Sequence, residues 1–265
     1  MTLMAQGVHG RMPAVFIGHG SPMNTLESNR FTQLWRDLAA SVERPTAILA
    51  ISAHWYVPAL AVTAMSSPRT IHDFSGFPPE LFAYEYPAPG SPELAQRIVD
   101  VLGPREVHLD ESSWGLDHGT WSVLAQMYPD AEIPVVQLSL DSRRDAREQM
   151  SIGAALAPLR DEGVLILGSG NVVHNLGALD WSSPDSGFDW ADRFDALVQS
   201  AMTTDPASLP SVMTGSDWQR SAPTPEHFLP LAPIAGLAAA TGRTAEVIIE
   251  GATMGSLTMT SYLVR

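Results

Sequence analysis

The sequence predicts an α/β fold in which helices flank a mostly parallel sheet that also contains some antiparallel strands. Two observations predict it. Short, continuously apolar runs such as residues 46–52 are typical of strands covered on both faces. Between these runs lie stretches with apolar residues at helical spacing, such as residues 29–42. Strands that alternate with helices along the whole chain indicate βαβ units and hence a parallel sheet.

The individual elements follow from these two patterns. We predict strands at residues 13–17, 46–52, 60–65, 105–109, 133–140, 164–167, 245–250 and 256–263. We predict helices at residues 29–42, 92–103, 119–128, 144–162, 189–203 and 226–241. Pro158 should kink or split its helix. Residues 66–92, which are rich in proline and aromatic side chains, and residues 205–225 should form loops.

The chain shows no repeat, low-complexity tract or linker, so we expect a single domain over residues 1–265. Residues 1–12 are expected to be a loosely ordered tail, and they lack the long apolar core of a signal peptide. No apolar run approaches the roughly 18 residues that a membrane span needs. These features predict a cytoplasmic protein.

Composition excludes several kinds of chemistry. The net charge of −14 argues against nucleic acid or an anionic membrane as the main partner. The absence of cysteine excludes a thiolate nucleophile and a cysteine-ligated cluster. The absence of lysine excludes a Schiff base and a P-loop. Eight histidines, the carboxylates, the hydroxyls and the arginines remain for chemistry.

Three histidines share one placement, since each comes after a predicted strand. His19 lies between two glycines, His54 precedes Trp55, which could shield a site from water, and His174 follows a Gly-Ser-Gly turn. In open α/β sheets ligands bind beyond the carboxyl ends of the strands, so these histidines should converge on one metal. Neutral imidazoles with few carboxylates favour Zn, Fe or Cu over Mg or Ca.

Three further histidines admit two interpretations each. His227 stands at the start of a predicted helix, where Glu226 beside it would also suit the helix dipole. His118 follows Asp117, which indicates either a polar pocket residue or an N-capping turn. His72 lies in the long aromatic loop, where it either contacts substrate or is solvated.

Seven motifs in order along the chain carry a family resemblance. They are Gly18-His-Gly-Ser-Pro22, Ser52-Ala-His-Trp55, Ile71-His-Asp-Phe74 with Gly76-Phe-Pro78, Tyr86-Pro-Ala-Pro-Gly90, Gly115-Leu-Asp-His-Gly119, Gly170-Asn-Val-Val-His-Asn175 and Pro223-Thr-Pro-Glu-His227. Together they resemble the 4,5-DOPA extradiol dioxygenase family, which belongs to the class III extradiol ring-cleavage dioxygenases. The resemblance covers nearly the whole chain.

This resemblance implies a single α/β domain with a central mixed sheet and a non-haem metal site. His19, His54 and His227 match metal-binding positions of the family. His174 matches an acid–base histidine that can also reach the metal as a further ligand, and His118 matches a pocket histidine that contacts substrate. Catalysis would use Fe(II), and Zn(II) can occupy such sites in isolated proteins.

The reaction implied by the resemblance is the opening of a catecholic, DOPA-like ring beside its hydroxyls with O2, which gives a muconic semialdehyde. His174 would take a proton from a hydroxyl and return one later. His72, His118 and Trp55 are the predicted substrate-binding residues. Glu226 is the alternative late ligand, because the usual oxygenase site has two histidines and a carboxylate. A zinc-dependent hydrolase using the same histidines, and a binding protein with metal-saturated histidines, are the alternative functions.

Overall fold

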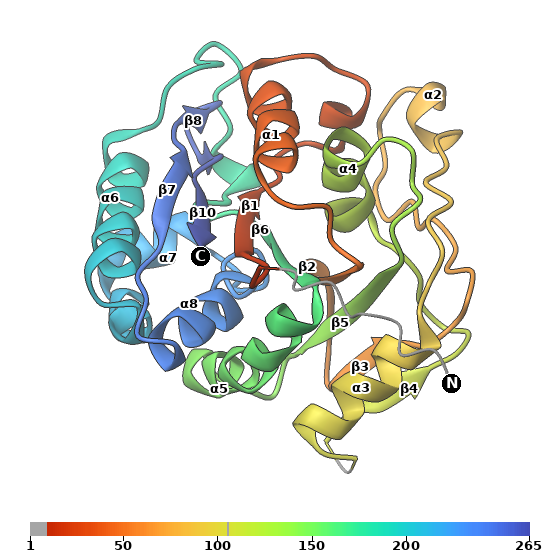
Figure 1. The fold of residues 1–265 in the computed structure, drawn as a ribbon. Helices are drawn as coiled ribbons and strands as arrows, with labels where there is room; N and C mark the ends of the chain where they lie inside the picture. The colour runs from red at the N-terminus through yellow and green to blue at the C-terminus, as the bar shows by residue number, and fades with distance from the viewer. Residues whose placement is uncertain (1–9, 105) are drawn as a thin grey trace, which may run out of the picture.

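An eight-stranded mixed sheet lies at the centre of the structure, a computed structural model that describes residues 10–104 and 106–265 (Figure 1). Its strand order is β4-β3-β5-β2-β6-β1-β10-β7. The strands are β1 Ala14–Gly18, β2 Ala47–Val57, β3 Ala61–Thr63, β4 His108–Asp110, β5 Val135–Asp141, β6 Val164–Gly170, β7 Glu246–Ile249 and β10 Ser261–Val264. The central strands β5, β2, β6 and β1 run parallel, whereas β3 and β10 pair with them antiparallel. The predicted fold class is confirmed.

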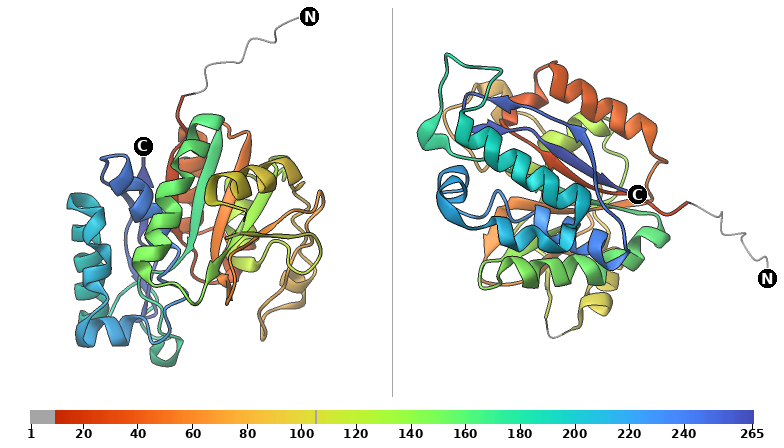
Figure 2. Two further views of the ribbon diagram at one scale, coloured as in Figure 1. Left: turned by 90° about the horizontal axis from the view of Figure 1, so that it is seen from below. Right: turned by 90° about the vertical axis from the view of Figure 1, so that its left-hand side faces the viewer.

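Helices cover both faces of this sheet (Figure 2). On one face, Trp35 of α1 and Trp121 of α4 belong to one buried apolar cluster. On the other, Met150 of α5, Phe194 of α6 and Ile234 of α8 belong to a second. Successive residues of β2 alternate between the two clusters, because strand side chains point to opposite faces in turn.

The helices and the small hairpin complete the fold. The helices are α1 Arg30–Ser41, α2 Pro79–Phe82, α3 Pro92–Leu102, α4 His118–Met127, α5 Ala146–Leu156, α6 Asp189–Thr204, α7 Gly215–Ser221 and α8 Leu231–Ala240. Short 3-10 helices are η1 Pro22–Thr25, η2 Ala157–Glu162, η3 Leu176–Ala178 and η4 Pro206–Val212. Strands β8 Ala252–Thr253 and β9 Leu257–Thr258 pair with each other.

Side-chain caps explain where several helices begin. Ser91 Oγ accepts from the Leu94 backbone N–H at 3.1 Å and caps α3. Asp117 Oδ1 accepts from the Thr120 N–H at 3.2 Å and caps α4. Pro158 lacks a backbone N–H, and the chain changes there from α5 to the 3-10 helix η2, as the sequence predicts.

Several stretches differ from the prediction. The predicted loop 66–92 contains the short helix α2, and the predicted strand 256–263 is divided into β9, in the hairpin, and β10, in the main sheet. Two other stretches contain several prolines. The predicted loop 205–225 contains η4 and α7, because apolar side chains such as Leu209 and Val212 are buried against the core. The predicted helix 226–241 begins only at Leu231, so residues 226–230 form a turn that precedes α8. The prolines in these stretches weaken the helical pattern that the prediction relies on.

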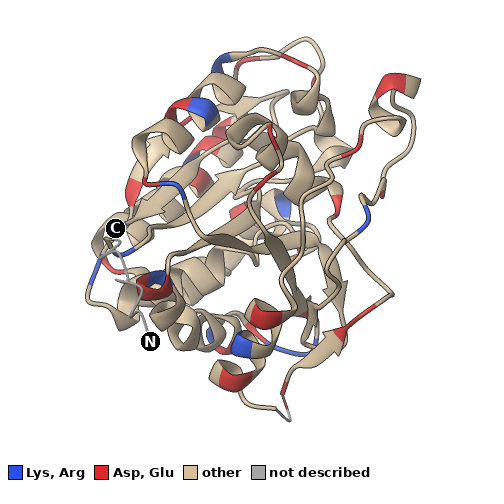
Figure 3. Cartoon of the chain, turned by 45° about the vertical axis from the view of Figure 1, so that its right-hand side comes forward, with Lys and Arg blue, Asp and Glu red and all other residues tan. Residues whose placement is uncertain are grey.

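The segment that precedes β1 is partly buried. Of the predicted tail, residues 1–9 lie outside the described residues, whereas Met12 is buried and its N–H donates to the Arg160 carbonyl at 3.0 Å. No helix in the described part of the chain is long and apolar enough to cross a membrane. Acidic residues outnumber basic ones by 29 to 15 and are distributed over most of the ribbon (Figure 3).

Candidate metal centre

The carboxyl ends of three neighbouring parallel strands bring the predicted histidines to one edge of the sheet. Gly18 at the end of β1 pairs with Gly170 at the end of β6, so His19 and the segment leading to His174 leave the sheet side by side. The backbone N–H of His19 donates to the Gly170 carbonyl at 2.9 Å. This edge is where α/β sheets bind ligands.

The prediction that His54 follows its strand is wrong. Strand β2 continues to Val57, so His54 lies within it. The strand extends beyond the apolar run, because the distal part of β2 still pairs with β5 after a register shift between Ile51 and Tyr56. Such irregularities re-aim side chains near functional sites.

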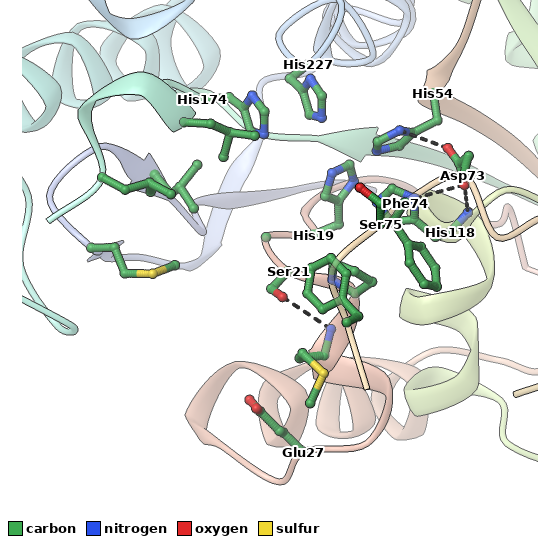
Figure 4. A pocket seen from close by; sticks show the side chains of 18 of the residues that line it. His19, Ser21, Glu27, His54, Asp73, Phe74, Ser75, His118, His174 and His227 are labelled. Carbon is green, nitrogen blue, oxygen red and sulfur yellow. Dashed lines mark hydrogen bonds and ion pairs between the residues drawn. The ribbon is translucent and has the colours of Figure 1, made fainter. Parts of the chain in front are cut away.

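His19, His54 and His227 form a compact cluster (Figure 4). One ring nitrogen from each lies within 4.8 Å of the corresponding nitrogen of the other two. The ring centroids are 5.3 Å apart for His19 and His54, 5.4 Å for His19 and His227, and 5.0 Å for His54 and His227. Three convergent imidazoles are a typical donor set for Zn, Fe or Cu.

Hydrogen bonding selects the protonated nitrogen of His19. Its Nδ1 lies 2.9 Å from Ser169 Oγ, and that hydroxyl donates to the Gly119 carbonyl at 2.5 Å. Because the hydroxyl gives its only proton to Gly119, it must accept from Nδ1–H. The lone pair of His19 is therefore on Nε2, as a metal ligand requires. Burial also lowers the pKa of His19 well below its usual value, which keeps the ring neutral.

Asp73 orients two histidines at once. Its Oδ2 lies 3.1 Å from His54 Nδ1, and its Oδ1 accepts from His118 Nδ1 at 2.9 Å and from the His118 backbone N–H at 3.1 Å. Burial lowers the pKa of His54, but the bond to Asp73 and the negative charges of Asp73, Asp117 and Glu226 together raise it overall. Sequence reasoning did not assign Asp73 a role; its position directly after His72 in a quoted motif was the available signal.

Glu226 orients His227 through a hydrogen bond in the same way. Its Oε1 lies 3.2 Å from His227 Nδ1 and accepts from Thr224 Oγ1 at 2.7 Å. Burial raises the pKa of Glu226, but these hydrogen bonds lower it to about 2. Burial lowers the pKa of His227 to about 4. The carboxylate is thus engaged behind the ring, and His227 rather than Glu226 belongs to the nitrogen cluster.

The cluster fits a divalent metal. In each of its three histidines, Nδ1 is held by a neighbouring side chain. The partner is Ser169 for His19, Asp73 for His54 and Glu226 for His227. Within residues 10–104 and 106–265, Nε2 of His54 is buried and has no hydrogen-bond partner. An unsatisfied buried polar group costs about 1–3 kcal/mol, and a metal ligated there would remove that cost.

His174 and His118 flank the cluster without belonging to it. The ring of His174 stacks on that of His227, with centroids 3.5 Å apart and planes 4° apart. Burial and the neighbouring imidazoles lower the pKa of His174 to about 2. His118 lies 3.8 Å from His54, centroid to centroid, and burial lowers its pKa.

Two predicted substrate-binding residues lie away from the cavity. Nε2 of His72 contacts the Tyr84 carbonyl at 2.8 Å, and Trp55 is buried with its ring stacked 5.7 Å from Trp114. Neither is among the residues that line the cavity.

A cavity of about 700 Å³ opens over the histidines and has the size of a small-molecule site. The three histidines of the cluster line it, together with the flanking His118 and His174 and with Asp73. Most of the other lining side chains are apolar: Pro22, Met23, Phe74, Phe77, Leu176, Leu179, Trp181, Met254 and Leu257. A planar apolar ring with polar substituents would match this surface.

Comparison with known proteins agrees with this geometry. The family model described as the catalytic LigB subunit of aromatic ring-opening dioxygenase matches residues 12–264. An Escherichia coli K12 protein named 4,5-DOPA dioxygenase extradiol is 48% identical over 95% of this chain and 94% of its own length. A Beta vulgaris protein of the same name is 42% identical over 93% and 94%. The crystal structure of an uncharacterized E. coli K12 protein, JW3007, superposes with a TM-score of 0.84 at 44% identity, covering 96% of this chain and 100% of that one.

The chain therefore belongs to the LigB family of aromatic ring-opening dioxygenases. Its fold, its histidine cluster and its relatives along nearly the full length make it an extradiol ring-cleavage dioxygenase. The family assignment made from the seven motifs is confirmed.

Proposed function

We propose that this enzyme uses Fe(II) and O2 to open a catecholic, DOPA-like ring beside its hydroxyls, giving a muconic semialdehyde. The observation that carries the proposal is the convergence of His19, His54 and His227. The Nδ1 atom of each ring is held by a neighbouring side chain. The names of the E. coli and Beta vulgaris relatives support the choice of substrate class.

These three histidines would hold the metal. Bound Fe(II) would supply the redox chemistry that lets O2 react with the ring. Zn(II) fits the same nitrogen donors but has no redox chemistry, so a zinc-loaded protein would be inactive as an oxygenase. Burial already keeps His19 and His227 neutral, so these two rings need no deprotonation to bind a cation.

Proton transfer falls to His174 in this proposal. The ring lines the cavity beside His227, and its lowered pKa keeps it neutral, with a free lone pair. It would hold a proton from a catechol hydroxyl while the negative catecholate lies beside it, because that charge offsets the effect of burial. A role of His174 as a fourth ligand stays a prediction. His118 would contact the substrate, since Asp73 fixes its Nδ1–H and leaves Nε2 as an acceptor.

Anaerobic reconstitution with Fe(II), followed by catechol and air, tests the proposal. We expect oxygen uptake and a yellow ring-cleavage product, both abolished by removal of the metal. His174→Ala should lower turnover by about 10²–10⁴-fold while iron binding changes little. His108→Ala, an exposed histidine of β4, is the matched control. Failure of every catechol in a panel to consume oxygen would refute the ring-opening proposal, and unchanged turnover in His174→Ala would remove its proton role.

The zinc hydrolase alternative is not favoured, because the family and its named relatives are dioxygenases. Hydrolytic activity with Zn(II) in the absence of oxygen would revive it. The cytoplasmic location and the absence of nucleic-acid and membrane partners stay predictions of the sequence.

A further inference from the structure

The cavity is larger than a lone catechol ring requires. An engineered cavity of about 150 Å³ is enough to hold benzene, whereas this one measures about 700 Å³. With a ring at the histidines, most of the volume remains for a substituent. The residues around that remaining volume therefore decide which ring substituents fit.

Glu27 is the charged residue at the end of the cavity away from the histidines (Figure 4). The other acidic lining residue, Asp73, is already engaged by His54 and His118. In the described part of the chain, no hydrogen bond or ion pair involves the Glu27 carboxylate, although its backbone N–H donates to the Met23 carbonyl. Glu27 thus presents an unpaired negative charge to whatever occupies this end.

No positive side chain balances it within the cavity. The described lining residues include no arginine, and the chain has no lysine. Arg30 lines a neighbouring cavity that shares Glu27, but its guanidinium lies over the Phe31 ring at 4.5 Å and 3.8 Å from Asp185. A carboxylate on the ring substituent would meet the Glu27 charge without an arginine or lysine among the described lining residues to pair with it.

We propose that Glu27 determines specificity by selecting catechols whose substituent carries a positively charged nitrogen, as that of DOPA does, and by disfavouring those whose substituent carries a carboxylate alone. This inference rests on the proposed function, since it assumes that the ring lies at the histidines. Because Glu27 is exposed at the mouth, its pairing energy is that of a surface ion pair, which corresponds to about two- to fivefold in affinity.

Three catechols whose substituents differ in charge test the inference with the metal-loaded full-length enzyme. They are 3,4-dihydroxyphenylethylamine, which is cationic, neutral 4-methylcatechol, and anionic 3,4-dihydroxyphenylacetate. Affinity is measured by anaerobic calorimetric titration, and kcat/KM by oxygen uptake. The affinity and the kcat/KM of each charged compound are divided by those of the neutral one, so that general effects on the site cancel.

In the wild-type enzyme the amine should bind better than 4-methylcatechol, and the carboxylate worse. Glu27→Gln should lower the amine ratio by about two- to fivefold, and Glu27→Arg should make the carboxylate the better ligand. Glu111→Gln removes an exposed carboxylate that does not line the cavity, and it should retain the wild-type ratios.

Equal ratios in Glu27→Gln and Glu111→Gln would overturn the inference, as would a wild-type preference for the carboxylate. The two proposals fail separately. If the amine binds preferentially through Glu27 but no catechol is cleaved, the ring-opening proposal fails and the charge selection stands. If 4-methylcatechol is cleaved without any charge preference, the charge selection fails alone.

Discussion

Gly119, the second residue of α4, lies where two histidines of the cluster approach the helix. A Cβ added there would stand 2.5 Å from Ser52 Oγ, 2.8 Å from His54 Cδ2 and 3.3 Å from His19 Cε1. Ser52 is held by a 2.7 Å bond to Asp117, and the His54 ring is held by its carboxylate partner. Gly119→Ala must therefore displace at least one of the rings.

The size of the effect follows from two opposing contributions. Alanine is favoured over glycine in a helix by up to about 1 kcal/mol, while overpacking of this kind costs about 1–3 kcal/mol. We expect a net loss of about 1–2 kcal/mol in the free energy of unfolding. Metal affinity should fall by about 10- to 100-fold, the usual effect of disturbing the groups that orient ligands.

Chelator competition for Fe(II) or Zn(II) measures the affinity, and thermal unfolding with and without metal measures the stability. Gly177→Ala is the matched control, because the nearest atom to its added Cβ is Asn175 Oδ1 at 3.4 Å, an ordinary contact. If Gly119→Ala binds metal as tightly as the wild type and unfolds no earlier, the close approach does not constrain the site and the reasoning is refuted.

Three further changes address the hydrogen bonds. Ser169→Ala removes the acceptor that fixes the His19 tautomer and the donor to the Gly119 carbonyl, so metal affinity should fall about tenfold and stability by about 1–2 kcal/mol. Asp73→Asn should weaken metal binding by about 10- to 100-fold, because an amide orients His54 less well than a carboxylate. Arginine hydrogen bonds lower the pKa of Asp141 to about 2, so its stabilisation is complete above the unfolded pKa near 4 and disappears as pH falls toward 2. Asp141→Asn should then lower the free energy of unfolding by about 1 kcal/mol at pH 7, a value discounted for solvent screening. It should also reduce the dependence of stability on pH in the acid range.

Each of these changes has a decisive contrary result. Calorimetric metal titration of Ser169→Ala and Asp73→Asn should be set beside Ser182→Ala, an exposed serine outside the site. Wild-type affinity in either site variant would mean that its hydrogen bond does not orient a ligand. For Asp141→Asn, urea unfolding between pH 2 and 7 is the measurement. A stability curve parallel to that of the wild type would show that the carboxylate does not stabilise the fold.

Local patterns predicted most of the framework. Continuous apolar runs indicated β1, β2 and β6, and the motif Ser91-Pro92-Glu93 indicated the start of α3, because burial and capping depend on neighbouring residues. The same patterns misjudged residues 205–225 and 226–230. There, packing against the core decides the conformation, and the prolines hide it from a periodicity argument.

By itself the sequence determined the fold class, the absence of thiol and lysine chemistry, and the short list of histidines that could form a site. It also determined the family, because the seven motifs lie in order along the chain. Only the tertiary structure decided which of these histidines meet, leaving His72 and Trp55 outside the cavity. It alone showed that Ser169, 150 residues from His19, fixes that ring, and that Glu27 faces the same cavity as His227. The physical reason is that strand and helix patterns depend on neighbouring residues, whereas the orientation of a side chain depends on partners that the folded sheet brings together.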